Sequence, residues 1–145
     1  MQNPSNQRQN DSKYPDGVGT HVGGVGNAQA IAVVVEDEWF LRMELADALA
    51  EAGWEVVELA TGEQALDWLE AGGEAALLVT DIRLPGPAEG WDVAEKFHAA
   101  HPETQVIYCS ANPLQEARQV PGSLFFAKPV RMDVVLEACG APSPR

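Results

Sequence analysis

The chain has 145 residues, 46% of them hydrophobic, which suits one folded domain around a single core. Its 22 acidic and 9 basic residues give a formal net charge of -13, so nucleic acid and anionic membrane surfaces should repel it, and we expect neither as a direct partner. No apolar stretch is long enough to cross a bilayer and no secretory signal opens the chain, so we expect a cytoplasmic protein.

Residues 1–29 are rich in Asn, Gln, Gly and Ser and contain almost no large apolar side chains. Such a segment cannot bury enough surface to offset the entropy of ordering it, so we expect a disordered N-terminal extension. Its glycines indicate a phosphate-binding loop only weakly, because such a loop follows a strand, whereas these glycines precede the first expected strand. We expect one domain over residues 30–140 and a short tail over 141–145.

From residue 30 onward, strand patterns and helix patterns alternate. We expect five strands, close to residues 31–35, 54–60, 75–80, 105–110 and 123–127. We expect helices over about 38–52, 61–70, 91–100 and 131–139, with a short helix after Pro113. Thr61 and Gln64 form a capping-box pair at the start of the second helix. The second strand mixes Glu55 and Glu58 with apolar residues, which suits the edge of a sheet, whereas the other strands are near-continuous apolar runs.

This alternation predicts a parallel sheet covered by helices on both faces. Right-handed crossovers favour a doubly wound, flavodoxin-like α/β fold, (βα)5, with five parallel strands in the order 2-1-3-4-5. Ligands in such folds bind outside the carboxyl ends of the strands, where the strand order reverses between the first and third strands.

Charged or hydroxyl side chains follow four of the expected strands. Glu36 and Asp37 follow the first, Asp81 the third, Ser110 the fourth and Lys128 the fifth. Each has an ordinary explanation alone, since acidic residues favour helix starts and lysines favour the surface. Their placement at one sheet edge favours a site, because clustered carboxylates repel one another without a cation. Mg2+ is the usual cation where phosphate is also handled, so we expect a site for Mg2+ and a phosphoryl group.

Four segments around these residues stand in order along the chain. They are Val33-Val34-Val35-Glu36-Asp37-Glu38, Leu78-Val79-Thr80-Asp81-Ile82-Arg83-Leu84-Pro85-Gly86, Ser110-Ala111 and Phe125-Phe126-Ala127-Lys128-Pro129. Together they resemble the receiver domain of two-component response regulators, over about residues 30–140. The chain departs from the usual pattern at Glu36, where Asp is commoner, and in the loop from Asp81 to Gly90, which is one residue longer and contains Pro87.

The resemblance implies a role for each acidic residue. Asp81 would be the phosphoacceptor, a carboxylate nucleophile that forms an acyl phosphate. Asp37 and Asp81 would bind Mg2+ directly, Glu36 would act through water, and Arg83 would offer its backbone carbonyl.

The resemblance also implies how the phosphoryl group would be recognised. Lys128 would pair with the phosphoryl oxygens, and Ser110 would donate a hydrogen bond to one of them. Phe125 would be the switch aromatic whose rotamer follows Ser110. The Lys128–Pro129 peptide bond would be cis, a geometry that proline tolerates.

A single-domain response regulator is therefore the expected function, and the protein would catalyse only its own phosphorylation and dephosphorylation. Its partners would be a sensor histidine kinase or histidine phosphotransfer protein and an unknown downstream protein, unless it passes phosphate along a relay. One alternative is an Asp-dependent phosphohydrolase of the haloacid dehalogenase type, which usually has a second Asp where Arg83 stands here. Another is a pseudo-receiver that binds partners without phosphorylation, although such a protein would be expected to lack a pocket carboxylate or the lysine.

Overall fold

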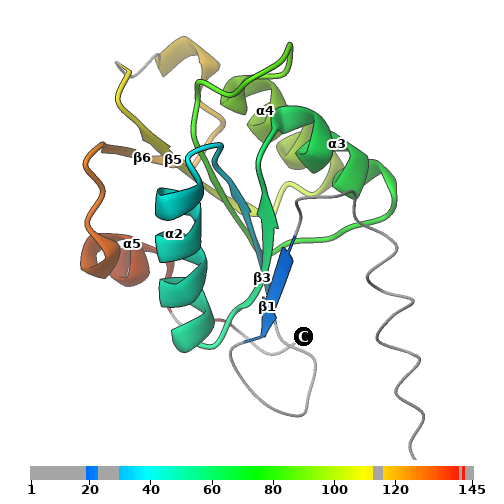
Figure 1. The fold of residues 1–145 in the computed structure, drawn as a ribbon. Helices are drawn as coiled ribbons and strands as arrows, with labels where there is room; N and C mark the ends of the chain where they lie inside the picture. The colour runs from blue at the N-terminus through cyan, green and yellow to red at the C-terminus, as the bar shows by residue number, and fades with distance from the viewer. Residues whose placement is uncertain (1–18, 23–29, 113–115, 141, 143–145) are drawn as a thin grey trace, which may run out of the picture.

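The computed structural model describes residues 19–22, 30–112, 116–140 and 142. A six-stranded sheet lies at the centre, with helices on both faces (Figure 1). The strands are β1 (Gly19–Val22), β2 (Ile31–Val35), β3 (Glu55–Leu59), β4 (Leu77–Thr80), β5 (Gln105–Ser110) and β6 (Leu124–Ala127). Strands β2 to β6 are parallel in the order β3-β2-β4-β5-β6, which confirms the predicted flavodoxin-like α/β fold with strand order 2-1-3-4-5.

Strand β1 was not predicted. It pairs with β3 in the antiparallel direction, with Gly19 opposite Glu58 and Val22 opposite Glu55, so β3 is not the edge of the sheet. The expected disorder is therefore wrong for residues 19–22. Pairing with an edge strand uses backbone groups, so the poverty of apolar side chains does not prevent it. The rest of the expected extension, and all but residue 142 of the expected tail, lie outside the described residues.

The described residues form four α-helices and one short 3-10 helix. The α-helices are α2 (Trp39–Glu51), α3 (Gly62–Glu70), α4 (Gly90–Ala100) and α5 (Met132–Cys139), and the 3-10 helix is η1 (Glu116–Arg118). The short helix expected after Pro113 is thus only a three-residue turn in its described part. The sequence from 115 to 119, Gln-Glu-Ala-Arg-Gln, offers no apolar face that packing could stabilise as an α-helix. None of the described helices is long and apolar enough to cross a membrane.

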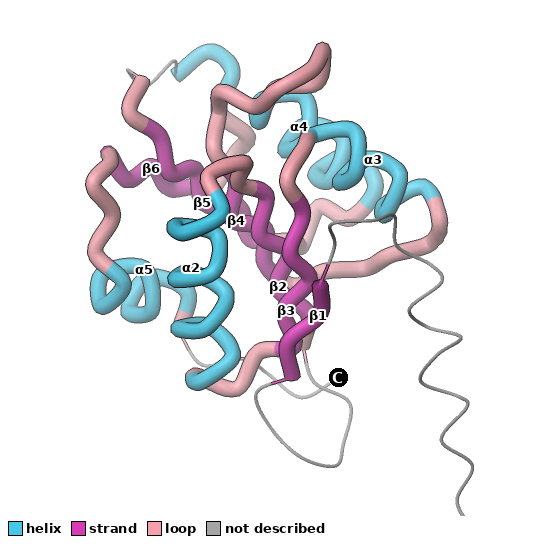
Figure 2. Tube along the Cα trace, viewed as in Figure 1, coloured by secondary structure: helices cyan, strands magenta, loops and turns pink. Residues whose placement is uncertain are grey.

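The two faces of the sheet carry separate hydrophobic clusters. Figure 2 shows the helices that cover each face. Val33 and Val35 of β2 point to the face covered by α3 and α4, where the rings of Trp68 and Phe97 stack 6.1 Å apart. Val34 points to the other face, which α2 and α5 cover. Because successive side chains of a strand alternate between faces, β2 and β4 are buried on both sides, as the apolar runs predict.

The predicted cap of α3 is present. Thr61 Oγ1 accepts a hydrogen bond from the Gln64 amide at 3.1 Å, and Gln64 Oε1 accepts one from the Ala60 amide at 2.8 Å. The cap fixes the start of α3, whose first turn holds the loop after Asp81.

Candidate functional site

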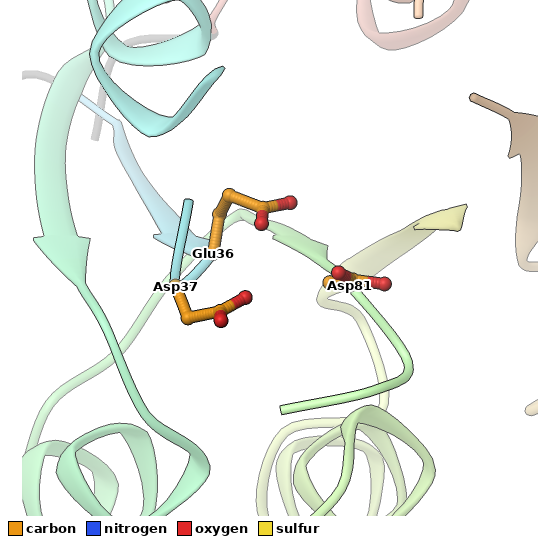
Figure 3. Close-up of side chains that lie close together, drawn as sticks. All are labelled: Glu36, Asp37 and Asp81. Atoms are coloured by element: carbon orange, nitrogen blue, oxygen red, sulfur yellow. The ribbon is translucent and has the colours of Figure 1, made fainter. Parts of the chain in front are cut away.

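Three carboxylates meet where two neighbouring strands end. Glu36 and Asp37 follow β2, and Asp81 follows β4. The register pairs Val35 with Thr80, so parallel pairing delivers the following residues to the same edge. One oxygen of each carboxylate lies within 4.8 Å of the others (Figure 3), with Glu36 and Asp81 buried and Asp37 exposed. The three acidic residues therefore meet at the edge of the sheet that the strand order predicts.

Lys128, which follows β6, supplies the positive charge of this cluster. Its Nζ lies 2.9 Å from Asp81 Oδ2 and 3.0 Å from Glu36 Oε1. Burial lowers the pKa of Lys128, but its hydrogen bond to Asp81 and its ion pair with Glu36 outweigh that effect and raise the pKa above its usual value. The ammonium therefore stays charged beside the two buried carboxylates.

Burial raises the pKa of Glu36 to about 7. A hydrogen bond from the Glu38 amide to Glu36 Oε2, 3.1 Å long, opposes this rise, while the negative charge of Asp81 adds to it. Without a second cation, the cluster is thus electrostatically unfavourable with all three carboxylates ionised. A bound divalent cation would remove that penalty.

The donor set fits Mg2+. All three side chains offer carboxylate oxygens, the ligands that a hard cation prefers, and Asp37 leaves the cluster open to solvent. Glu36 Oε1 is buried and accepts no well-aligned hydrogen bond from the described residues, although the Lys128 ammonium is nearby. Such an oxygen favours a further positive partner. The side chain of Arg83 is exposed, and the role of its backbone carbonyl stays a prediction.

The Asp81 carboxylate is held in one orientation. Oδ1 accepts a 2.6 Å hydrogen bond from the Ile82 amide, while Oδ2 faces Lys128. The Gly90 amide donates to the carbonyl of Ile82 at 2.8 Å, which closes the loop. A Cβ atom at Gly90 would collide with the carbonyl oxygen of Asp81, so this close approach needs glycine.

The loop after Asp81 docks on the first turn of α3. Glu63 Oε2 accepts a 2.8 Å hydrogen bond from the Ala88 amide. Gly62 lies so close to Ala88 that a Cβ there would collide with it, and Gly86 turns the loop with a φ of 87°. The loop is therefore held against the first turn of α3.

Ser110 and Phe125 lie on the neighbouring strands. Ser110 is fully buried at the end of β5, and its Oγ accepts a 3.1 Å hydrogen bond from the amide of Asn112, a partner that sequence reasoning did not identify. Phe125 on β6 is half-buried against the cluster under α3 and α4. The Lys128–Pro129 peptide bond is cis, as predicted. The switch roles of Ser110 and Phe125 stay predictions.

Sequence reasoning also missed Arg42. Its Nη1 donates a 2.7 Å hydrogen bond to the backbone carbonyl of Glu36. The only signal in the sequence is its place six residues after Glu36, within the first two turns of α2.

Comparisons with known proteins agree with this geometry. Residues 32–139 match the family described as the response regulator receiver domain. The chain is 32% identical over 111 residues to the chemotaxis protein CheY of Bacillus subtilis, a match that covers 73% of this chain and 91% of that protein. It is 33% identical over 85 residues to the sensor kinase CckA of Brucella abortus, where the match covers 58% of this chain and only 9% of the kinase. A solved structure of a response regulator receiver protein from Sinorhizobium medicae aligns with a TM-score of 0.73 and 27% identity, over 77% of this chain and 91% of that one. The chain therefore belongs to the family of response regulator receiver domains.

Proposed function

We propose that this protein is a response regulator that accepts a phosphoryl group on Asp81 from a sensor histidine kinase or a histidine phosphotransfer protein. The observation that carries the proposal is the surrounding of Asp81. Its buried carboxylate lies among Glu36, Asp37 and Lys128, and Lys128 Nζ is 2.9 Å from Oδ2. In the reaction, an oxygen of Asp81 bonds to phosphorus while the phosphorus–nitrogen bond of a phosphohistidine breaks, and the ring nitrogen keeps the electron pair.

Positioning and charge neutralisation would drive this transfer, with little other covalent chemistry for the protein to do. The Ile82 amide holds Oδ1, which fixes the direction of attack. Lys128 would move from Asp81 Oδ2 to a phosphoryl oxygen as charge on the carboxylate is consumed. The protein would therefore act on no substrate beyond its own phosphorylation and dephosphorylation.

Glu36, Asp37, Asp81 and the backbone carbonyl of Arg83 would hold Mg2+, with Glu36 acting through water. The cation supplies positive charge to the phosphoryl oxygens. The oxygen-only donor set and the buried Oε1 of Glu36 support this assignment.

An exposed aromatic surface beside the site supports a protein as the phosphoryl donor. At the start of α2, the side chains of Trp39 and Phe40 are 63% and 55% exposed, and their rings meet edge to face. A groove runs from Phe40 to Lys128 and Pro129 on the loop after β6. Exposed aromatic groups are typical of binding surfaces, so a partner seated here would bring its phosphohistidine close to Asp81.

The similarity to a sensor kinase supports a place in kinase signalling or in a phosphorelay. Because the kinases that make phosphohistidine use ATP, the reaction belongs in the cytoplasm. Output would follow from contact with a downstream protein, or from passing the phosphoryl group on. The phosphohydrolase alternative gains no support, since Arg83 occupies the position of its second Asp with an exposed side chain.

The test is labelling of the purified protein with acetyl phosphate and Mg2+, followed by mass spectrometry. The wild type should gain one phosphoryl group with the acid and base lability of an acyl phosphate, and Asp81→Asn should gain none. Asp133→Asn is the matched control, because Asp133 is exposed on α5 and should label normally. Labelling retained in Asp81→Asn would contradict the site, and an unlabelled wild type would favour the pseudo-receiver.

A further inference from the structure

Arg42 reaches back from α2 to the loop that carries the acidic pair. Its Nη1 donates a 2.7 Å hydrogen bond to the backbone carbonyl of Glu36. The amide of Glu36 donates a hydrogen bond to the carbonyl of Leu59 at 3.0 Å, and the Glu38 amide donates to Glu36 Oε2. The backbone of Glu36 is thus fixed from both sides, by β3 and by α2.

The other side of the guanidinium faces Glu58 of β3. Arg42 Nε lies 3.5 Å from Glu58 Oε1, and the two side chains are only 15% and 13% exposed. By contrast, the surface pair of Arg131 and Asp133 is 73% and 68% exposed. Withdrawing two charges from water is unfavourable unless their contacts compensate. The burial of the Arg42–Glu58 pair therefore requires contacts that an exposed surface pair does not need.

The geometry of the pair indicates which contact offsets the cost of withdrawing the two charges from water. Arg42 Nε is buried and makes no hydrogen bond within the described part of the chain, so its contact with Glu58 is an ion pair without good hydrogen-bond alignment. The short, well-formed bond goes to the Glu36 carbonyl instead. A charged donor to a carbonyl is one of the stronger hydrogen bonds in proteins. The position of the guanidinium is therefore set by the loop, with Glu58 as its counter-charge.

We propose that Arg42 is a positioning residue that holds Glu36 and Asp37 in the geometry that binds Mg2+, with Glu58 anchoring its guanidinium. The inference deepens the proposed function and rests on it for the identity of the metal. Figure 3 shows that Glu36 and Asp37 come from one loop, while Asp81 comes from the end of another strand. Arg42 holds the first of these loops through the Glu36 carbonyl. Holding this loop therefore sets the separation of the carboxylates across two strands.

Charge alone makes the opposite prediction. A guanidinium near a cation site repels the cation, so its removal should tighten Mg2+ binding if Arg42 acts only through its field. If Arg42 positions the loop, its removal should weaken Mg2+ binding. The sign of the change thus separates the two explanations.

The experiment measures Mg2+ binding by calorimetry and by tryptophan fluorescence on the full chain. Arg42→Met keeps the length of the side chain and removes its donors, and we expect its Kd to rise about tenfold, the scale typical of residues that orient metal ligands. Arg42→Lys keeps the charge without the forked geometry, so its Kd should rise less. Arg118→Lys is the matched control, because Arg118 pairs with Glu95 on the surface and should leave the Kd unchanged.

A second measurement needs no metal. In chelator, amide hydrogen exchange at Glu38 should be faster in Arg42→Met, because this amide bonds to Glu36 Oε2 in the loop that is released. Exchange in the core of β4 should stay as in the wild type, which excludes global unfolding. If Arg42→Met does not fold, Arg42→Lys and Glu58→Gln provide the same two measurements.

Tighter or unchanged Mg2+ binding in the Arg42 variants, or an unchanged Glu38 amide, would overturn the inference. Failure of the proposed function looks different. If the wild type binds no Mg2+, the metal assignment fails, and the exchange of the Glu38 amide still decides whether Arg42 holds the loop.

Discussion

The two oxygens of Asp81 have different partners, and this difference matters for its reactivity. Oδ1 accepts a hydrogen bond from the backbone amide of Ile82, whose position is fixed by the chain. Oδ2 accepts one from the ammonium of Lys128, whose flexible side chain can move away. The phosphoryl group would thus be accepted on Oδ2, where Lys128 can withdraw and follow the incoming charge. Glu36 shares the same ammonium, so its charge state is linked to this exchange of partners.

The raised pKa of Glu36 gives a prediction for the metal-free protein. A carboxyl with a folded-state pKa of about 7, against 4.5 when unfolded, binds its proton more tightly in the fold. Its contribution to stability is therefore fully present below pH 4.5 and is lost as the pH rises through about 7. Urea unfolding in chelator should show this loss between about pH 4 and about pH 8, values that bracket the shift. Glu36→Gln cannot titrate, so it should lack this component of the pH dependence.

Excess Mg2+ provides the control for this titration. It should reduce the loss of stability with rising pH in the wild type, because a cation stabilises the ionised carboxylates. Parallel pH profiles of the wild type and Glu36→Gln in chelator would contradict the assignment of the raised pKa to Glu36.

At the scale of elements, β1 changes how the edge of the sheet is protected. Without it, β3 would present unpaired backbone groups along one side, guarded only by Glu55 and Glu58. With it, those groups are paired by a segment of the same chain. The strand is short, so the hydrogen bonds that it adds are largely offset by the entropy of ordering four residues.

A chain that lacks residues 1–29 should therefore lose only about 1 kcal/mol of stability, the scale of a net hydrogen bond. The larger effect should be local, with faster amide exchange in β3 (Glu55–Leu59) because its backbone partners are gone. Urea unfolding and hydrogen exchange measure the two effects. Removal of residues 1–18 alone is the control, since it keeps β1. Unchanged exchange in β3 of the shorter chain would show that β1 does not protect the edge.

How far the sequence predicts these elements depends on the range of the interaction. The cap at Thr61 and Gln64 is local, and the meeting of Glu36 with Asp81 follows from strand order, so both could be read from the sequence. The pairing of β1 depends on backbone groups that every residue carries, so composition does not reveal it. Arg42 was missed for a similar reason, because one of its two partners is a backbone carbonyl.

At the scale of the whole molecule, contacts along β5 and β6 connect the site to η1. The Lys128 amide donates to the Ser110 carbonyl at 3.0 Å, so the loops after β5 and β6 are joined at the site. Phe125 lies opposite Tyr108 in the register of β5 and β6. The Tyr108 hydroxyl accepts a 3.2 Å hydrogen bond from the Val120 amide, which follows η1. A displacement of Phe125 would therefore reach η1 through the buried ring of Tyr108.

This connection predicts a response to the phosphoryl mimic beryllofluoride with Mg2+. Ser110 would move toward the mimic to donate a hydrogen bond to it, Lys128 would be drawn from Asp81, and Phe125 would turn into the space released. Amide exchange should then change at η1 and β6 as well as in the loops that hold the carboxylates. A stabilisation of the active state by only a few kcal/mol is enough to produce such a population shift.

Ser110→Ala separates switching from binding. It keeps the three carboxylates and Lys128, so it should still bind the mimic, but without the hydroxyl the changes at η1 and β6 should shrink. The Phe125 side chain is the proposed link, and Phe125→Ala should have the same selective effect. If the wild type changes only in the loops that carry Glu36, Asp37 and Asp81, the site is not coupled to this surface. Passive transfer of phosphate along a relay would then be the better account, because a relay requires Asp81 to be loaded and unloaded without any change at a distant surface.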